Sequence, residues 1–162
     1  MNRMLRLFSA SAFALLALGC RESEGEGSEL HESAEADTAQ YLTPYGPPTR
    51  PFSPAVRVGD LIFLSGQIGT DASASGGVVA GGIEAETRQT LDNIQKVLAD
   101  IGSSMDKVVK CTVMMADMKE WDRMNTIYTS YFKQGRLPAR SALGANGLAL
   151  GARVEIECIA SA

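Results

Sequence analysis

The sequence predicts an α+β domain in which two helices pack on one face of a mixed, mostly antiparallel sheet. Two segments carry apolar residues at three- and four-residue spacing, which is typical of amphipathic helices. Short segments rich in β-branched and aromatic residues flank and separate them, as strands do. The order of strands, helix, strand, helix and strands fits helices layered on one sheet. At 162 residues, the chain has room for one such domain.

The predicted domain starts with a β-hairpin. Residues 56–58 and 61–67 are rich in apolar side chains and flank Gly59-Asp60, a pair that favours a tight turn. The glycine-rich residues 72–82 then predict a loop.

The first helix is predicted over residues 83–101. Its charged residues lie away from an apolar stripe that consists of Ile83, Leu91, Ile94, Val97, Leu98 and Ile101. Gly102 fits the end of this helix. Residues 108–115, which contain three valines, predict the next strand.

The second helix is expected after Asp117, which fits an N-cap. Its apolar stripe includes Trp121, Tyr128 and Tyr131. These aromatic residues are expected in the core, with a ligand platform as the alternative. Residues 139–143 and 153–161 complete the set as strands.

The first twenty residues are typical of an export signal. Two arginines precede an apolar run over residues 7–18 that is too short to span a bilayer as a stable helix. Residues 16–20 (Leu-Ala-Leu-Gly-Cys) resemble a bacterial lipobox, which implies cleavage of a signal peptide 1–19 and lipidation of Cys20. We expect an exported protein that is lipid-anchored at a bacterial membrane, on the periplasmic side. Arg21 favours the outer membrane in a Gram-negative cell, and an ordinary secretory signal is the alternative.

Residues 20–46 predict an acidic, disordered tether ahead of a domain at 47–162, because carboxylates dominate the tether and bulky apolar residues are nearly absent from it. The only histidine of the chain, His31, falls in this tether. No second histidine or cysteine lies near it at ligand spacing, so no metal site is expected. The net charge of −4 argues against nucleic acid as a partner.

Three blocks of the domain resemble the RidA/YjgF family of imine deaminases: GDLIFLSGQI at 59–68, PARS at 138–141 and GARVEIECIA at 151–160. Residues 87–94 and 125–132 match between them. The resemblance covers nearly all of residues 51–162. It implies a chorismate-mutase-like fold, no cofactor, and a homotrimer with clefts between neighbouring subunits. The implied reaction is hydrolysis of reactive 2-enamino or 2-imino acids to 2-keto acids and ammonia.

Arg140 is the first candidate for a catalytic and substrate-binding residue. Its planar guanidinium can engage the carboxylate of a 2-imino acid through two charge-assisted hydrogen bonds. The alternative is a structural ion pair.

A carboxylate is the natural proton carrier of a domain without histidine. Glu155 and Glu157 are predicted on the same face of the last strand. The resemblance assigns the water-positioning acid or base to Glu155, whereas the residues alone do not separate the two.

Three further residues are candidates for substrate binding. The main chain at Ser65-Gly66 can be approached by a ligand, and the Gly66 N–H could hold a carboxylate. The alternative at this place is a β-bulge. Asn125 matches a position that lines the family's cleft, although an ordinary surface asparagine fits as well.

Phe52 is also assigned to the cleft, where active members of the family commonly carry tyrosine. Its hydroxyl is missing here, and Tyr41 or Tyr45 could substitute for it. We therefore keep a second hypothesis, in which the domain is a non-catalytic module that binds small carboxylates. An endoribonuclease is a third possibility, which the acidic balance and the lack of histidine in the domain disfavour.

Cys111 and Cys158 occupy predicted strands. Both are expected to be free and to pack as small apolar side chains, although export would permit a disulfide.

Overall fold

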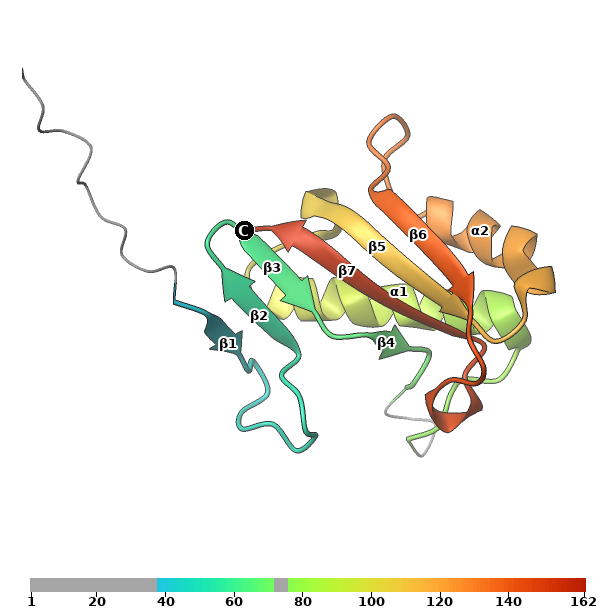
Figure 1. Cartoon of the computed structure of the whole chain (residues 1–162), viewed down its shortest axis with the longest axis horizontal. Coiled ribbons are helices and arrows are strands. Elements are labelled where there is room, and N and C mark those ends of the chain that lie inside the picture. The colour runs from blue at the N-terminus through green and yellow to red at the C-terminus, as the bar shows by residue number, and fades with distance from the viewer. Residues whose placement is uncertain (1–37, 72–75) are drawn as a thin grey trace, which may run out of the picture. The chain divides into compact units, whose positions relative to one another are not determined.

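The described part of the chain, residues 38–71 and 76–162 of a computed structural model, forms one seven-stranded sheet with two helices (Figure 1). The strands are β1 (Gln40–Leu42), β2 (Ala55–Val58), β3 (Leu61–Leu64), β4 (Gln67–Ile68), β5 (Val108–Met115), β6 (Ala139–Gly144) and β7 (Val154–Ser161). Their order is β1-β2-β3-β7-β5-β6, and β4 also pairs with β7. Only the β5–β6 pair is parallel, so the predicted mixed sheet is confirmed.

Helix α1 (Gly82–Asp100) runs behind the sheet in the view of Figure 1, and α2 (Trp121–Thr129) lies beside β6. The predicted apolar stripe of α1 is the reason for this packing, since Ile83, Leu91, Ile94 and Leu98 are fully buried. Glycine at 102 allows the chain to leave the helix with a φ of 78°.

Strand β7 alternates between the two faces of the sheet. Val154, Ile156 and Cys158 are buried on the face that the helices cover. Glu155 and Glu157 project from the opposite face, as the sequence predicts.

The opposite face of the sheet is not covered by any element of residues 38–71 and 76–162. Strand register places four large apolar side chains on it, each between 38 and 47 % exposed: Val58, Leu61, Phe63 and Leu143. On this face, Lys110, Thr112 and Glu157 separate the group on β2 and β3 from Leu143 on β6. Exposed apolar side chains on an uncovered sheet face occur at interfaces between subunits.

Part of the predicted tether belongs to the sheet. Residues 1–37, which include the predicted signal peptide, Cys20 and most of the tether, lie outside the described residues. Within the predicted tether, however, β1 pairs antiparallel with β2. Main-chain hydrogen bonds hold this edge strand. The composition of its side chains therefore did not reveal it.

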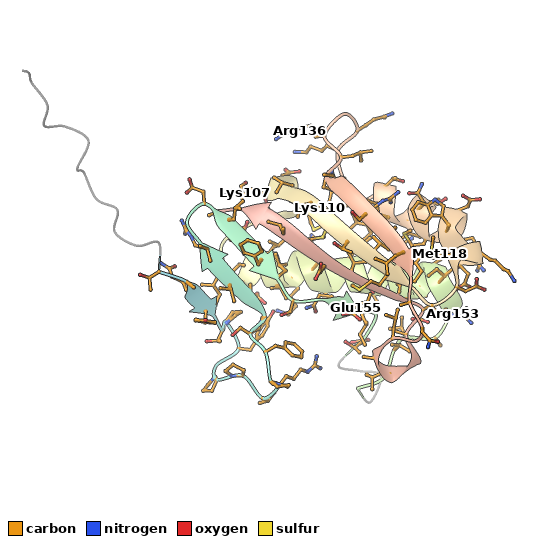
Figure 2. The ribbon with its side chains drawn as sticks, in the orientation of Figure 1. Lys107, Lys110, Met118, Arg136, Arg153 and Glu155 are labelled. Carbon is orange, nitrogen blue, oxygen red and sulfur yellow. A yellow bond between two sulfur atoms is a disulfide. The ribbon has the colours of Figure 1, made fainter. Side chains whose placement is uncertain are left out.

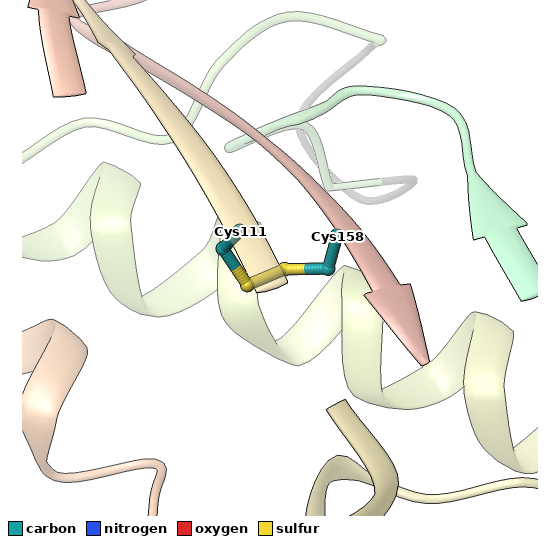
Figure 3. Close-up of a disulfide and its surroundings, with 2 residues drawn as sticks. All are labelled: Cys111 and Cys158. Atoms are coloured by element: carbon teal, nitrogen blue, oxygen red, sulfur yellow. A yellow bond between two sulfur atoms is a disulfide. The ribbon is translucent and has the colours of Figure 1, made fainter. Parts of the chain in front are cut away.

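The expectation of two free cysteines is wrong, because Cys111 and Cys158 form a disulfide between β5 and β7 (Figure 3). The register of these strands sets the two residues directly opposite each other, with Cα atoms 4.1 Å apart. Both are buried in the core. The disulfide therefore links two central strands of the sheet.

Candidate functional site

Arg140 lies against helix α2. Its guanidinium carbon is 4.6 Å from the centre of the Tyr128 ring and 5.0 Å from that of the Trp121 ring. Its Nη1 donates a hydrogen bond to Oδ1 of Asn125 at 2.8 Å. Successive turns of α2 present these three partners on one side of the helix. We call Arg140, Asn125, Trp121 and Tyr128 the arginine site.

The arginine site holds a fixed positive charge. No carboxylate pairs with Arg140 in the described part of the chain, so these residues do not hold it in a structural ion pair. Burial raises the pKa of Tyr128 to about 12, so its ring stays neutral beneath the cation. With Nη1 directed at Asn125, other N–H groups of Arg140 remain for a ligand carboxylate.

Two aromatic residues of α2 have a role beyond the core that the sequence analysis does not include. Tyr128 belongs to the core and also contacts Arg140, and the half-buried Trp121 does the same from the edge. Their role as supports of the guanidinium was missed because the apolar stripe already explained them. The spacing of Trp121, Asn125 and Tyr128, four and then three residues, was the available signal.

Glu155 lies against the main chain between β3 and β4. A Cβ atom added to Gly66 would overlap Oε1 of Glu155 and would lie 3.1 Å from its Cδ. The side-chain hydroxyl of Ser65 donates to the carbonyl of Ser53 at 2.7 Å, which fixes the neighbouring loop. We call Ser65, Gly66 and Glu155 the glutamate site, and Figure 2 shows its carboxylate beside β4.

The Ser65-Gly66 segment is also a β-bulge. Phe63 pairs with Ile159, whereas Gln67 pairs with Ile156, so β3 and β4 use one residue more than β7 between these pairs. Such a bulge bends the strand and re-aims the side chains around it. The β-bulge at Ser65-Gly66 and the close approach of Glu155 to the main chain therefore occur at the same place.

The carboxyl of Glu155 is tuned toward its protonated form. Burial raises its pKa above the ordinary value, and the negative charge of Glu157 raises it further. A half-buried acid of this kind can hold a proton and pass it to a bound molecule or water.

The arginine and glutamate sites lie on opposite faces of the sheet within one chain. Arg140 is in register with Cys111, which faces the helices. Glu155 is in register with Met114, three residues further along β5, which faces the other way. One chain therefore does not bring Arg140 and Glu155 into one cleft.

Phe52 lies next to the glutamate site, because the adjacent Ser53 bonds to Ser65. Its ring is 47 % exposed. Tyr45 does not replace the missing hydroxyl, since its own donates to Asp100 at 2.6 Å and its pKa is raised to about 12 by burial and that bond. Tyr41 is on β1, three strands away from β7.

The described residues contain no cluster of side chains that could hold a metal ion. They also contain no helix that is long and apolar enough to cross a bilayer.

The chain is similar to known proteins over most of residues 38–162. The family model described as Endoribonuclease L-PSP matches residues 44–162. A mouse protein described as 2-iminobutanoate/2-iminopropanoate deaminase is 47 % identical over 110 residues, which are 68 % of this chain and 80 % of that protein. Reactive Intermediate Deaminase A, chloroplastic, from Arabidopsis thaliana is 39 % identical over 111 residues, 68 % and 58 % of the two chains. The crystal structure of a Yersinia pestis protein of the conserved Rid family superposes with a TM-score of 0.69 at 36 % identity, over 77 % of this chain and 100 % of that chain.

Proposed function

Because the chain belongs to the RidA/YjgF (Endoribonuclease L-PSP) family, we propose that it hydrolyses reactive 2-enamino and 2-imino acids to 2-keto acids and ammonia. The observation that carries this proposal is the unpaired Arg140 guanidinium, stacked on two rings and oriented by Asn125. Relatives described as 2-iminobutanoate/2-iminopropanoate deaminases, at 44–47 % identity, support the choice of reaction.

Binding starts with the carboxylate of the substrate. A guanidinium fork engages it through two parallel hydrogen bonds, which orient the adjacent C=N carbon. Asn125 keeps the plane of the fork in place. The 2-imino acid, the 2-enamino acid and the 2-keto acid all contain this carboxylate. Arg140 therefore recognises all three, and other residues contact the side chain of the substrate.

The chemistry requires one proton carrier and one water molecule. A proton added to the β-carbon of the enamine gives the iminium ion, and water then adds to the C=N carbon. Proton transfer to nitrogen allows the C–N bond to break, which releases ammonia and leaves the carbonyl of the 2-keto acid. Glu155, with its raised pKa, is suited to hold the water and to move these protons.

The complete cleft forms between two copies of the chain in this proposal. The two sites lie on opposite sheet faces within one chain, and β6, which carries Arg140, is the last strand of the sheet, where a second copy can approach. The exposed apolar side chains on the uncovered face of the sheet, such as Phe63 and Leu143, support association of one copy of the chain with another. A homotrimer with three such clefts satisfies both features, because a head-to-tail contact closes into a ring.

Subunit complementation tests the shared cleft directly. Arg140→Ala and Glu155→Gln are each expected to be inactive as pure assemblies. Random mixing of the two in refolded trimers restores about one quarter of the clefts, those that combine an intact arginine site with an intact glutamate site. Mixing Arg140→Ala with Asn125→Ala, which damage the same site, is the control. Mixed trimers without activity, or a monomer in sedimentation, would overturn the shared cleft.

The activity itself is tested with imino acids generated in situ by an amino-acid oxidase. The purified protein should accelerate loss of the imine, and Arg140→Ala should not. A folded trimer that accelerates none of a panel of imino acids would refute the deaminase.

The second candidate is a carboxylate-binding module without fast chemistry, which Phe52 favours because it lacks the hydroxyl of active relatives. Titration with 2-keto acids would then show binding that depends on Arg140 without turnover. An endoribonuclease remains disfavoured, since the net charge is −4 and the described residues contain no histidine. An RNA ladder that stays intact with the purified protein excludes it.

We further propose that the protein works outside the cytoplasm, lipid-anchored through Cys20. The buried disulfide supports this location, because disulfides persist in oxidising compartments. Cell fractionation should recover the protein with membranes, and Cys20→Ser should release it to the soluble fraction. Recovery of the unaltered protein in the cytoplasm with free thiols would contradict the proposal.

A further inference from the structure

A cavity of about 350 Å³ lies between residues 45–54 and helix α1. None of the residues of the arginine and glutamate sites lines it, although Phe52, which lies next to the glutamate site, does. One wall is the loop 45–54, and the other includes Asn93, Lys96 and Val97. Its size is at the lower end of the range for small-molecule pockets. We call it the loop pocket.

The charged side chains of the loop pocket are both positive. They are Arg50 and Lys96, and no carboxylate lines the cavity. Lys96 is held by Asp100 at 2.7 Å, whereas Arg50 has no ion pair among residues 38–71 and 76–162. In a chain with a net charge of −4, this cavity therefore presents a local positive charge that suits an anion.

Much of the remaining lining is apolar. Phe52 and Val97 contribute side chains, and three prolines contribute main chain without N–H donors. The half-exposed ring of Phe52 gains contacts if a ligand covers it. This wall suits the hydrocarbon body of a ligand rather than a second charge.

Hydrogen bonds fix several of the residues that line the loop pocket. Tyr45 donates to Asp100, and Nζ of Lys96 lies 5.3 Å from the centre of the Tyr45 ring. The amide of Asn93 donates to the carbonyls of Ile68 and Thr70 at 3.0 and 2.9 Å. The cavity is thus formed before a ligand arrives, which lowers the entropy cost of binding.

From this arrangement we propose that the loop pocket binds a small organic anion with an apolar body. Arg50 holds the carboxylate, and the body lies along Phe52 and Val97. The ligand resembles the product of the proposed reaction in its charge, but its carboxylate contacts neither Arg140 nor Glu155. Phe52 is the one residue that the loop pocket shares with the candidate substrate cleft, so ligand binding here is measured separately from turnover.

Calorimetric titration of the mature chain with phenylacetate tests the pocket. Acetate lacks the body and benzyl alcohol lacks the charge, so both should bind at least tenfold more weakly. Arg50→Ala should weaken phenylacetate at least tenfold and leave deamination unchanged, whereas Arg50→Lys should retain part of the affinity. Arg140→Ala should leave this binding intact.

Two results would overturn the proposal. Phenylacetate binding that is lost in Arg140→Ala and retained in Arg50→Ala would place the ligand in the arginine site. Absence of saturable binding at millimolar phenylacetate, in a protein shown to be folded, would mean that the loop pocket does not take this class of ligand. Neither result depends on whether imines are hydrolysed.

Discussion

The arginine and glutamate sites achieve their properties in different ways. The arginine site is made of side chains from one helix and one strand, and it is built around a planar guanidinium. The glutamate site is made by a main-chain bulge and the space left by a glycine, and its charge depends on its surroundings. In the proposed mechanism, the arginine site binds the substrate and the glutamate site carries protons. The proposed cleft needs both sites, which lie on opposite faces of the sheet within one chain.

Loss of the disulfide is expected to have the largest effect on the protein. The disulfide links β5, which pairs with the strand of Arg140, to β7, which carries Glu155. The double variant Cys111→Ala with Cys158→Ala should lower the free energy of unfolding by about 2–4 kcal/mol, since the bridge closes a long loop of the unfolded chain. Denaturant unfolding measures this loss. Thr112→Ala, on the same strand but facing the other way, is the control. A double variant as stable as the parent would show that the two strands need no covalent link.

Arg140→Ala should reduce kcat/KM on the order of 100-fold, because a poorly oriented substrate reacts slowly. Arg140→Lys keeps the charge and loses the fork, so it should recover only part of the activity. Steady-state kinetics on imino acids measure both. Equal activity of the lysine variant and the parent would show that charge alone is used at the arginine site.

Gly66→Ala should impair the glutamate site without unfolding the protein. The added Cβ would occupy the position of Oε1 of Glu155, so the carboxylate must move. We expect a loss in kcat of roughly tenfold or more, with a small change in KM, as is typical for displaced catalytic groups. Ser65→Ala, which removes only the bond to Ser53, should cost less. A fully active Gly66→Ala would remove Glu155 from the mechanism.

Glu157→Gln is expected to have the smallest effect. Removing a neighbouring negative charge favours ionisation of Glu155, so its raised pKa should fall toward the ordinary value. The limb of the pH–rate profile that reports Glu155 should then shift to lower pH by less than about one unit. Asp122→Asn removes the same charge from α2 and should shift nothing. A shift to higher pH would contradict the assignment of this limb to Glu155.

Local patterns in the sequence predicted the helices, the strands and the faces of β7, because periodicity reports which side of an element is buried. The stripe of α1 and the alternation around Glu155 are examples. The disulfide, the bulge at Gly66 and the opposite facing of Arg140 and Glu155 depend on how strands far apart in the chain are paired. A single sequence contains no direct record of that register, so the arrangement of these residues was not foreseen.

The position of β7 also sets the order of events when the protein is made. This strand follows every other described strand along the chain, yet it lies in the middle of the sheet between β3 and β5 and carries one half of the disulfide. The sheet therefore cannot close before β7 has been synthesised. Until then, the hairpin and α1 expose apolar surfaces to other chains. Chaperones that hold nascent chains would therefore remain in contact with this protein until the eight-residue β7 arrives.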